Sequence, residues 1–499
     1  METTLDVGGL RLPAHIGGRP STTDGGLLLP AGDVGITHPF GATGFYRHGW
    51  TSWSPTGWWP LTRASWRGPA FESPVVSASA SSEGQRPLHS SAVGALDGPD
   101  GNVLLLGGLG LGMPRIESDD RTMSGHSEEP TAPWFLGYGS EQALFARYAD
   151  LLVERLGQRN RRAGNVWCSW YSYFGNITET RIREAVEVMR GLAFDIVQVD
   201  DGWQPCVGDW HAGPDFPSGM AALAEHIREG GFRPGLWLAP FIASAKSRLF
   251  HDRRHLFLHD GEGAPIVVGH NWGAPFYALD TTLPETVDHI VDVFGRVKAW
   301  GYDYLKLDFM YAAAIAAPRS QDVPRELAFR EAVSVVRSIV GEDTYLLGCG
   351  VPVISSIGLF DGVRVGPDTA PYWYNRACAN DYSRPGARNA VFTSLHRLWL
   401  RDAFELDPDV VYFRTRYNLL DETHKRYLTD LARVCDFRGT SDPIDWLESD
   451  ESSALAEFLN GKPRVTQVGR YQFTIDGRDV DFWPAIDPER QTADHDLVK

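Results

Sequence analysis

The sequence predicts a multidomain α/β and β protein, in which a central (β/α)8 TIM barrel, residues 156–444, is flanked by an N-terminal β-sandwich, residues 1–155, and a small C-terminal β domain, residues 445–499. Three observations predict this fold. The 499 residues are too many for one hydrophobic core. After Asn165, strands and helices alternate over about 280 residues, a length that suits a closed eightfold barrel. The flanking segments lack this alternation and instead contain short apolar runs.

The first 155 residues are rich in Gly, Pro and Ser and show few helical periodicities. Runs such as 103–106, followed at once by Gly107-Gly108, are typical of strands that end in turns. At the other end, strands are expected at 470–475 and 480–483, followed by a polar tail from Asp487 that we expect to be frayed. Both ends are therefore predicted to be β-structure.

The barrel is expected to begin with a strand at 165–173. Further strands are expected at 195–201, 233–240, 302–308, 344–349 and 362–366, and the last two near 398–401 and 435–437. The helices between them are expected at 178–190, 220–229, 282–300, 324–340, 384–396 and 416–434. An irregular excursion after Pro240 separates the third strand from its helix.

Composition limits the partners. The formal net charge of −17 and the pI of about 5.3 argue against nucleic acid or an anionic membrane. No run approaches the ~18 apolar residues of a membrane helix, and residues 1–20 lack the pattern of a signal peptide. The five cysteines form no CxxC pair or zinc spacing, so we expect reduced thiols in a cytoplasmic protein. The sequence allows an oligomer without specifying one.

The most informative segment is the expected strand at 302–309. Tyr304, Lys306 and Asp308 fall on one face, and two leucines fall on the other. The leucine face suits packing under helices, which turns the polar face inward at the carboxyl end of the strand, where barrel active sites lie. Lys306 is expected to keep Asp308 ionised. Asp308 is therefore a candidate nucleophile or metal ligand.

The carboxyl ends of the other expected strands carry more polar and aromatic side chains. They are Trp167, Trp170, Asp200, Asp201, Trp237, Cys349 and Arg364, with Asp368 just beyond. The set contains no His, whereas zinc sites usually need imidazole or thiolate and a nucleophilic triad needs a positioned His. We therefore expect neither a metal nor a cofactor.

Two carboxylates between aromatic walls are the minimum set for glycoside hydrolysis. An ionised Asp308 suits the nucleophile, and Asp368 lies in 366–373 among aromatic and apolar neighbours that favour its protonated form, which suits an acid/base. Each residue also has a structural interpretation. The Asp200-Asp201 pair could cap a helix, Lys306 could serve only as an ion-pair partner, and Cys349 could be a small filler. The segment 407–409 is typical of a turn or scaffold element.

In order along the chain, these motifs resemble clan D glycoside hydrolases, most closely the family 36 α-galactosidases, over nearly the whole chain. The matching segments are Gly49-Trp50-Thr51-Ser52-Trp53-Ser54, Val199-Asp200-Asp201-Gly202-Trp203, Gly235-Leu236-Trp237, Tyr304-Leu305-Lys306-Leu307-Asp308, Cys349 and Arg364-x-x-x-Asp368.

The resemblance implies a retaining exo-α-galactosidase that acts on a terminal α-linked galactoside or oligosaccharide. It makes Asp308 the nucleophile and Asp368 the acid/base, with carboxyl groups about 5–5.5 Å apart. It also implies that the following residues bind the sugar: Asp200, Asp201 and Lys306 at the 4-, 6- and 3-hydroxyls, Arg364 and Cys349 near positions 2 and 3, and Trp53, Trp167, Trp170, Trp203 and Trp237 as aromatic contacts.

Three segments depart from the family pattern. Tyr171 follows Ser169-Trp170 where relatives often have an acidic residue, 350–352 replaces a Ser and a glycine run, and 238–241 lacks a Pro-Glu pair. These changes touch the 2-substituent pocket and the aglycone side, so an α-N-acetylgalactosaminidase or a transglycosidase is an alternative. A lyase or aldolase with Lys306 as Schiff base is less favoured, because Asp308 disfavours a neutral lysine. A non-catalytic sugar-binding protein is also less favoured, since both carboxylates are present.

Overall fold

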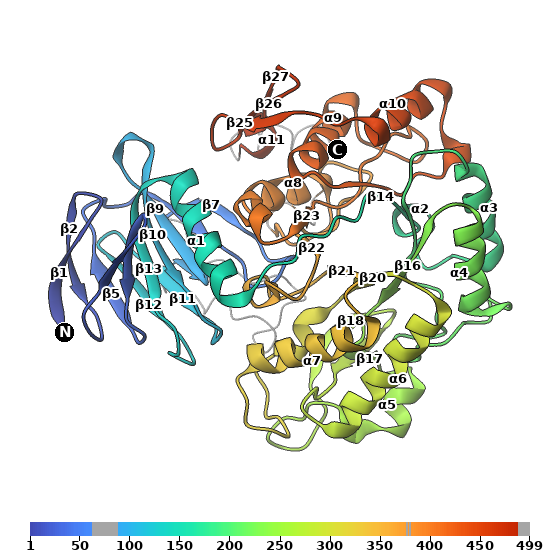
Figure 1. Ribbon diagram of the computed structural model, residues 1–499, viewed down its shortest axis with the longest axis horizontal. Coiled ribbons are helices and arrows are strands. Elements are labelled where there is room, and N and C mark those ends of the chain that lie inside the picture. The colour runs from blue at the N-terminus through green and yellow to red at the C-terminus, as the bar shows by residue number, and fades with distance from the viewer. Residues whose placement is uncertain (62–87, 376–377, 379–380, 488–499) are drawn as a thin grey trace.

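The computed structural model describes residues 1–61, 88–375, 378 and 381–487. Two antiparallel sheets form the N-terminal part, and a curled parallel sheet surrounded by helices forms the centre (Figure 1). A small three-stranded sheet follows near the carboxyl end of the chain. The predicted combination of a barrel-like domain with β domains is therefore confirmed. Among the described residues, no helix is both long and apolar enough to cross a membrane.

The N-terminal part consists of two sheets and a helix that the sequence analysis missed. The six-stranded sheet has the order β1 (Glu2–Val7), β2 (Leu10–His15), β5 (Val34–Thr37), β12 (Thr122–His126), β11 (Arg115–Ser118), β8 (Leu88–Ser91). The seven-stranded sheet has the order β3 (Ser21–Thr23), β4 (Gly26–Leu29), β13 (Trp134–Ser140), β10 (Asn102–Gly108), β9 (Val93–Asp97), β6 (Gly44–Arg47), β7 (Gly57–Pro60). The 3-10 turn η1 (Pro99–Gly101) joins β9 to β10.

Helix α1 (Glu141–Leu156) packs against β10 and β13 and lies between this part and the barrel (Figure 1). Its buried residues Leu144, Tyr148, Leu151 and Leu152 recur at helical spacing. This spacing is visible in the sequence, so the expectation of uninterrupted β-structure up to residue 155 is wrong for this segment.

The central sheet has eight parallel strands. Their order is β24 (Arg438–Thr440), β14 (Asn165–Cys168), β15 (Ile196–Val199), β16 (Arg233–Leu238), β20 (Tyr304–Leu307), β21 (Tyr345–Gly348), β22 (Gly362–Arg364), β23 (Glu405–Asp407). Beyond β23 the chain returns to β24, where Val411 forms a parallel bridge with Thr440 and its N–H donates to the Gly439 carbonyl over 2.9 Å. The segment that follows one edge strand, β23, therefore contacts the other edge strand, β24.

Helices cover the outside of this sheet, as Figure 1 shows. They are α3 (Glu179–Met189), α4 (Gly219–Glu229), α6 (Pro284–Trp300), α7 (Arg325–Val340), α8 (Ala387–Leu395), α9 (Glu422–Cys435) and α10 (Ser449–Asn460). Short turns between them are α2 (Trp170–Tyr173), η3 (Met310–Ala314), η4 (Ile354–Ser356), η5 (Leu398–Asp402) and η6 (Ile444–Trp446).

The excursion after β16 is ordered into a small sheet. It has the order β17 (Ile242–Ser244), β19 (Ala274–Ala278), β18 (Val267–Asn271), and is accompanied by α5 (Arg248–Asp252) and η2 (Arg254–Leu256). Trp272 and Gly273 connect β18 to β19, both with positive φ (53° and 66°), as a two-residue hairpin turn requires. The hairpin places an indole at its tip.

Several predicted elements are wrong. The strand expected to reach residue 173 ends at Cys168, and 170–173 is the turn α2. The strands expected near 398–401 and 435–437 are the turn η5 and the end of α9; the real strands are β23 and β24. These strands have three residues each, too short to show a period. The expected return to β-structure after Asp445 is wrong for 449–460, which form α10.

The chain ends, within the described part, in a sheet with the order β25 (Val465–Gln467), β26 (Gln472–Ile475), β27 (Arg478–Asp481), followed by α11 (Trp483–Ile486).

One loop of the N-terminal part is fixed against the barrel. The buried Arg397 guanidinium donates to the carbonyl of Thr51 over 2.7 Å, to those of Ser54 and Val365 over 3.1 and 3.0 Å, and to that of Ser52. The carboxylate of Glu326 in α7 accepts from the N–H groups of Gly112 and Met113 over 2.8 and 2.9 Å. Buried charge-assisted hydrogen bonds therefore hold residues 51–54 at the mouth of the barrel and residues 112–113 against α7.

Candidate active site

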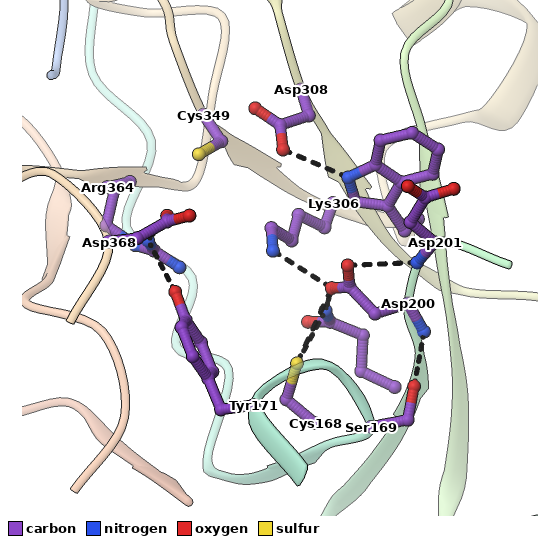
Figure 2. A network of polar contacts seen from close by, with 12 residues as sticks. Cys168, Ser169, Tyr171, Asp200, Asp201, Lys306, Asp308, Cys349, Arg364 and Asp368 are labelled. Atoms are coloured by element: carbon purple, nitrogen blue, oxygen red, sulfur yellow. Dashed lines mark hydrogen bonds and ion pairs between the residues drawn. The ribbon is translucent and has the colours of Figure 1, made fainter. Parts of the chain in front are cut away.

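A cavity of about 340 Å³ opens at the carboxyl end of the parallel strands. Its polar lining includes the predicted residues Asp200, Asp201, Lys306, Asp308 and Asp368. Figure 2 shows the side chains of Asp308, Asp368, Lys306 and Cys349 projecting toward the same open space. The fold therefore brings together carboxylates from three different strand ends, those of β15, β20 and β22.

Asp308 is the first residue after β20, and its N–H continues the sheet by donating to the Leu238 carbonyl over 2.8 Å. One carboxylate oxygen accepts from the Trp237 indole over 3.0 Å, and the other accepts from the Phe309 N–H over 2.9 Å. Burial raises the pKa of Asp308 above its ordinary value, although Lys306 and the Trp237 hydrogen bond oppose the shift. The expectation that Lys306 holds the pKa of Asp308 low is therefore wrong, because burial outweighs the lysine.

Lys306 pairs with Asp200 instead. Its ammonium donates to an Asp200 oxygen over 2.9 Å, and both side chains are buried (Figure 2). Burial lowers the pKa of Lys306, but the acidic groups around it, Asp200 first and then Cys168 and Asp308, together raise this pKa well above the usual range. A lysine held in this way is protonated, so the structure gives no support to Schiff-base chemistry.

The Asp200 carboxylate is fixed by further contacts. Its second oxygen accepts from the Asp201 N–H over 2.9 Å, and its backbone N–H donates to the Ser169 hydroxyl over 2.9 Å. The Cys168 thiol donates to the same oxygen as Lys306 over 3.4 Å, and the Gln198 amide also donates to it. This carboxylate therefore does not act as a helix cap.

Asp201 faces the cavity from the same loop. Its oxygens accept from the Gln204 amide and from the Trp272 indole, both over 2.7 Å. Burial raises the pKa of Asp201, and the two hydrogen bonds oppose this. Sequence reasoning missed Trp272, because the hairpin that carries it lies in the irregular excursion.

Asp368 lies in the loop after β22, and its side chain is 38% exposed. Arg364 donates to it over 3.0 Å and, through its other nitrogens, lies 3.2 Å from Asp407 and 2.9 Å from Asp409. One buried cation therefore lies among three carboxylates. Figure 2 shows Asp368 across the open space from Asp308.

Asp409 ties the loop of Asp368 to the barrel. It accepts from the N–H of Thr369, the next residue after Asp368, over 2.8 Å, and also from the Tyr171 hydroxyl. Burial raises the pKa of Asp409 to about 7, although Arg364 opposes the shift. The segment 407–409 thus serves as scaffold, and Tyr171 takes part in the same network.

Four indoles line the cavity: Trp53, Trp170, Trp237 and Trp272. Trp53 comes from the N-terminal part, which therefore contributes to the lining of the cavity. Its ring centroid lies 5.1 Å from that of Phe309, and its N–H donates to the Cys349 sulfur over 3.4 Å. A Cβ atom on Gly350 would come within 2.9 Å of this ring, so the glycine after Cys349 is required for the contact.

Four of the predicted site residues do not line the cavity. Trp167 and Trp203 are fully buried and donate to the carbonyls of Asp442 and Trp237 over 3.0 and 2.8 Å, so their expected substrate contact finds no support. Cys349 and Arg364 are buried just behind the lining, in contact with Trp53 and Asp368. Within the described residues, no group of three or more His, Cys, Asp or Glu could hold a metal ion.

A curled parallel sheet with paired carboxylates and indoles at its mouth defines the class of the barrel glycoside hydrolases. A family model described as Melibiase matches residues 138–340. The α-galactosidase TtGalA from Thermus thermophilus, in complex with p-nitrophenyl α-D-galactopyranoside, is 41% identical, with a TM-score of 0.90 over 97% of this chain and 100% of that one. The chain therefore belongs to the GH36-type α-galactosidase family.

Other relatives are more distant. The probable α-galactosidase C of Aspergillus flavus is 28% identical over 160 residues, which are 28% of this chain and 21% of that protein. The match thus spans about a fifth of the length of that relative. The α-galactosidase AgaA of Geobacillus stearothermophilus is 15% identical with a TM-score of 0.59, over 90% of this chain and 65% of that one, and shares the fold.

Proposed function

We propose that this protein is a retaining exo-α-galactosidase that hydrolyses terminal α-linked galactose by double displacement. The observation that carries the proposal is that Asp308 and Asp368 line one cavity together with Asp200, Asp201 and Lys306. The Thermus relative that matches over the whole chain forms complexes with p-nitrophenyl α-D-galactopyranoside and with stachyose, which supports an α-galactoside substrate.

In the first step, the Asp308 carboxylate attacks the anomeric carbon, and the bond to the leaving oxygen breaks. Asp368 gives its proton to that oxygen, so that a β-linked galactosyl ester forms on Asp308. The two hydrogen bonds from Trp237 and Phe309 hold Asp308 in a fixed orientation before the attack. Asp368 is partly exposed, so it exchanges protons with water.

In the second step, water attacks the anomeric carbon from the side that the leaving group vacated. Asp368 takes the proton of that water, the ester bond to Asp308 breaks, and α-galactose leaves with net retention. Arg364 holds one oxygen of Asp368 over 3.0 Å and leaves the other for the proton transfers.

Galactose is distinguished from glucose by its axial 4-hydroxyl. The proposed partners of the sugar hydroxyls are the buried pair Asp200–Lys306 and Asp201. An epimer that lacks the matching hydroxyl would leave these buried groups unpaired, and polar sites reject such analogues strongly. The indoles of Trp53 and Trp272 supply apolar walls for the C–H faces of the ring.

The proposal also covers the domain arrangement and the location of the protein in the cell. We propose a closed (β/α)8 barrel between an N-terminal β-sandwich and a small C-terminal β domain, and the bridge from Val411 to Thr440 supports the closure. We also propose a cytoplasmic location, which the five free cysteines support.

A second candidate is α-N-acetylgalactosaminidase. It is favoured by the similarity to the A type blood α-D-galactosamine galactosaminidase of Flavonifractor plautii, which is 28% identical over 155 residues, 29% of this chain and 14% of that protein. The contact between Trp53 and Cys349 closes the wall at which the family resemblance places the sugar 2-position. We therefore favour galactose, whose 2-hydroxyl is smaller than an acetamido group.

The test compares p-nitrophenyl α-galactoside with its N-acetylgalactosamine counterpart, using wild type, Asp308→Ala and the exposed control Asp481→Asn. We expect faster turnover of the galactoside and a loss of roughly 10³-fold or more in Asp308→Ala alone. Early proton NMR spectra should show α-galactose as the first product. Undiminished turnover by Asp308→Ala, or β-galactose as the first product, would overturn the proposal.

A further inference from the structure

A second and larger cavity, of about 730 Å³, lies outside the proposed active site. It is bordered by α2 and α3 on one side, and by Tyr417 and η6 on the other. The turns α2 and η6 follow the strands β14 and β24 closely, and Tyr417 lies in the segment between β23 and α9, so the cavity opens at the same end of the barrel as the active cavity. Its floor includes the buried residues Trp167, Ala185 and Met189. None of its lining residues has a role in the proposed hydrolysis.

Aromatic rings and the Arg181 guanidinium line this second cavity, and Arg416 lies next to the lining residue Tyr417. The Trp446 ring lies between Tyr173 and Tyr417, with centroid distances of 6.4 and 5.5 Å and nearly perpendicular planes. Arg181 lies over the Tyr173 ring, 5.0 Å from its centroid, and Arg416 lies equally far from that of Trp446. Tyr417 is 70% exposed, which is unusual for a large ring packed against other rings.

The turn α2 and Phe174, the residue after it, supply rings to both cavities. Trp170 lines the active cavity, Phe174 lines the second one, and their ring centroids are 5.4 Å apart. Phe174 is 48% exposed and has a φ of 48° and a ψ of −142°. A bulky residue in that region is strained, and such strain concentrates at functional sites. The strained turn is therefore a shared wall between the two cavities.

The polar lining carries both signs of charge. Arg181 donates to the Asn176 carbonyl over 2.6 Å, and the Glu184 and Asp445 carboxylates make no hydrogen bond or ion pair with other described residues. These carboxylates can accept from hydroxyl groups, and Arg181 can donate to them. A lining of this composition favours neither an anionic nor a cationic ligand. It suits a neutral ligand that has both apolar faces and hydroxyl groups.

We propose that this second cavity is a carbohydrate-binding site, separate from the active cavity, that binds neutral oligosaccharide segments. Sugar rings present C–H faces to indole and phenol rings and hydroxyls to carboxylates and guanidinium groups, which are the groups found here. The proposal extends the proposed function, because a chain bound beside the mouth of the barrel raises the local concentration of chain ends. Binding itself does not depend on hydrolysis.

The test uses galactomannan immobilised in a native gel, with Asp308→Ala as background so that the polymer is not cleaved. Saturating galactose fills the active cavity. We expect retardation of this protein, and an affinity about tenfold weaker when Tyr417→Ala and Trp446→Ala are added. Phe174→Gly, which removes the ring and relieves the strain, should act in the same direction. Trp483→Ala, at an exposed indole outside the cavity, is the control.

Three readouts separate the outcomes. In the otherwise wild-type protein, Tyr417→Ala and Trp446→Ala should leave turnover of p-nitrophenyl α-galactopyranoside within about twofold. Unchanged retardation in the cavity variants would overturn the proposal. Light scattering could instead show a dimer that Tyr417→Ala dissociates. That result, together with no retardation in the gel, would also overturn the proposal, because the cavity would then bind a second copy of the chain. An inactive wild type that is still retarded would contradict the hydrolase proposal alone.

Discussion

The Lys306 ammonium donates to the Asp200 carboxylate over 2.9 Å, with the two side chains only 5% and 2% exposed. This pair joins β20 to the end of β15 across the inside of the curled sheet. Asp308, two residues further on, is held instead by Trp237 and by the Phe309 N–H. The lysine of the nucleophile strand therefore orients a proposed sugar-binding carboxylate, and the nucleophile has its own separate donors.

Removing one member of this pair should destabilise the fold. Lys306→Met leaves the Asp200 charge buried without its cation, which we expect to lower the free energy of unfolding by about 3 kcal/mol. Urea denaturation at pH 7 measures this. Adding Asp200→Asn to Lys306→Met should restore part of the loss, because no buried charge is then left unpaired. Lys298→Met, at an exposed lysine, is the control, and an equal effect there would contradict the assignment.

Azide should distinguish the two catalytic carboxylates by the stereochemistry of their products. In Asp308→Ala, azide replaces the nucleophile and expels p-nitrophenolate from the α-galactoside, which gives β-galactosyl azide. In Asp368→Ala, the galactosyl ester still forms because p-nitrophenolate leaves without an acid, and azide then attacks it to give α-galactosyl azide. Turnover of the Asp368 variant without azide should fall by about 10²–10⁴-fold. Proton NMR of the products is the measurement, and the reverse pairing of anomers would refute both roles.

The acid limb of the pH–rate profile should report on Asp308. Burial raises the pKa of this carboxyl, and the Trp237 hydrogen bond partly offsets the shift. The nucleophile must be ionised, so kcat/KM should rise with pH at a midpoint above that of an ordinary aspartate, about 3.9. Trp237→Phe removes the donor and should move the midpoint to higher pH.

Trp272→Phe is the matched control for this measurement. Its indole donates to Asp201 and not to Asp308. We expect a changed KM for the galactoside but an unmoved acid limb. A limb that shifts equally in both variants would show that the Trp237 hydrogen bond does not tune Asp308.

The central sheet and most of the site could be predicted because polar and apolar side chains alternate along the strands that carry the site residues. On β14, Cys168 contacts the inward-facing Asp200, so its neighbour Trp167 must face outward. The same parity rule, applied to the sequence, would have excluded Trp167 from the site. In contrast, Trp237 pairs in register with Lys306 and shares its inward face.

The site residues that sequence analysis missed are those that reach the site only through long-range tertiary contacts. Trp272 reaches Asp201 from the tip of a hairpin 71 residues away, and no strand–helix period marks that segment. Asp409 contacts Arg364 and Tyr171, and the three residues come from three different strand ends of the barrel. The pattern Asp-Pro-Asp is equally compatible with a surface turn, so the sequence could not separate a turn from a buried charge network.

That network leads to a prediction about stability. Arg364 is one cation facing Asp368, Asp407 and Asp409, and Tyr171 and Tyr412 also face Asp409. A single guanidinium cannot neutralise three carboxylates, and burial raises the pKa of Asp409 to about 7. The carboxyl is therefore protonated more readily in the folded state than in the unfolded chain, where its pKa is about 3.9.

Since the folded pKa is the higher one, Asp409 contributes stability below pH 4 or so and loses that contribution as the pH rises through about 7. Asp409→Asn imitates the protonated carboxyl and cannot ionise. Relative to wild type, Asp409→Asn should therefore gain stability steadily between about pH 4 and 7. The unfolding free energy of the variant minus that of wild type should increase over this range and level off above it. Urea midpoints across this range measure the difference. Asp252→Asn, at an exposed carboxylate of α5, should give a flat difference. A flat difference for Asp409→Asn as well would mean that Arg364 keeps all three carboxylates ionised, which would contradict the raised pKa.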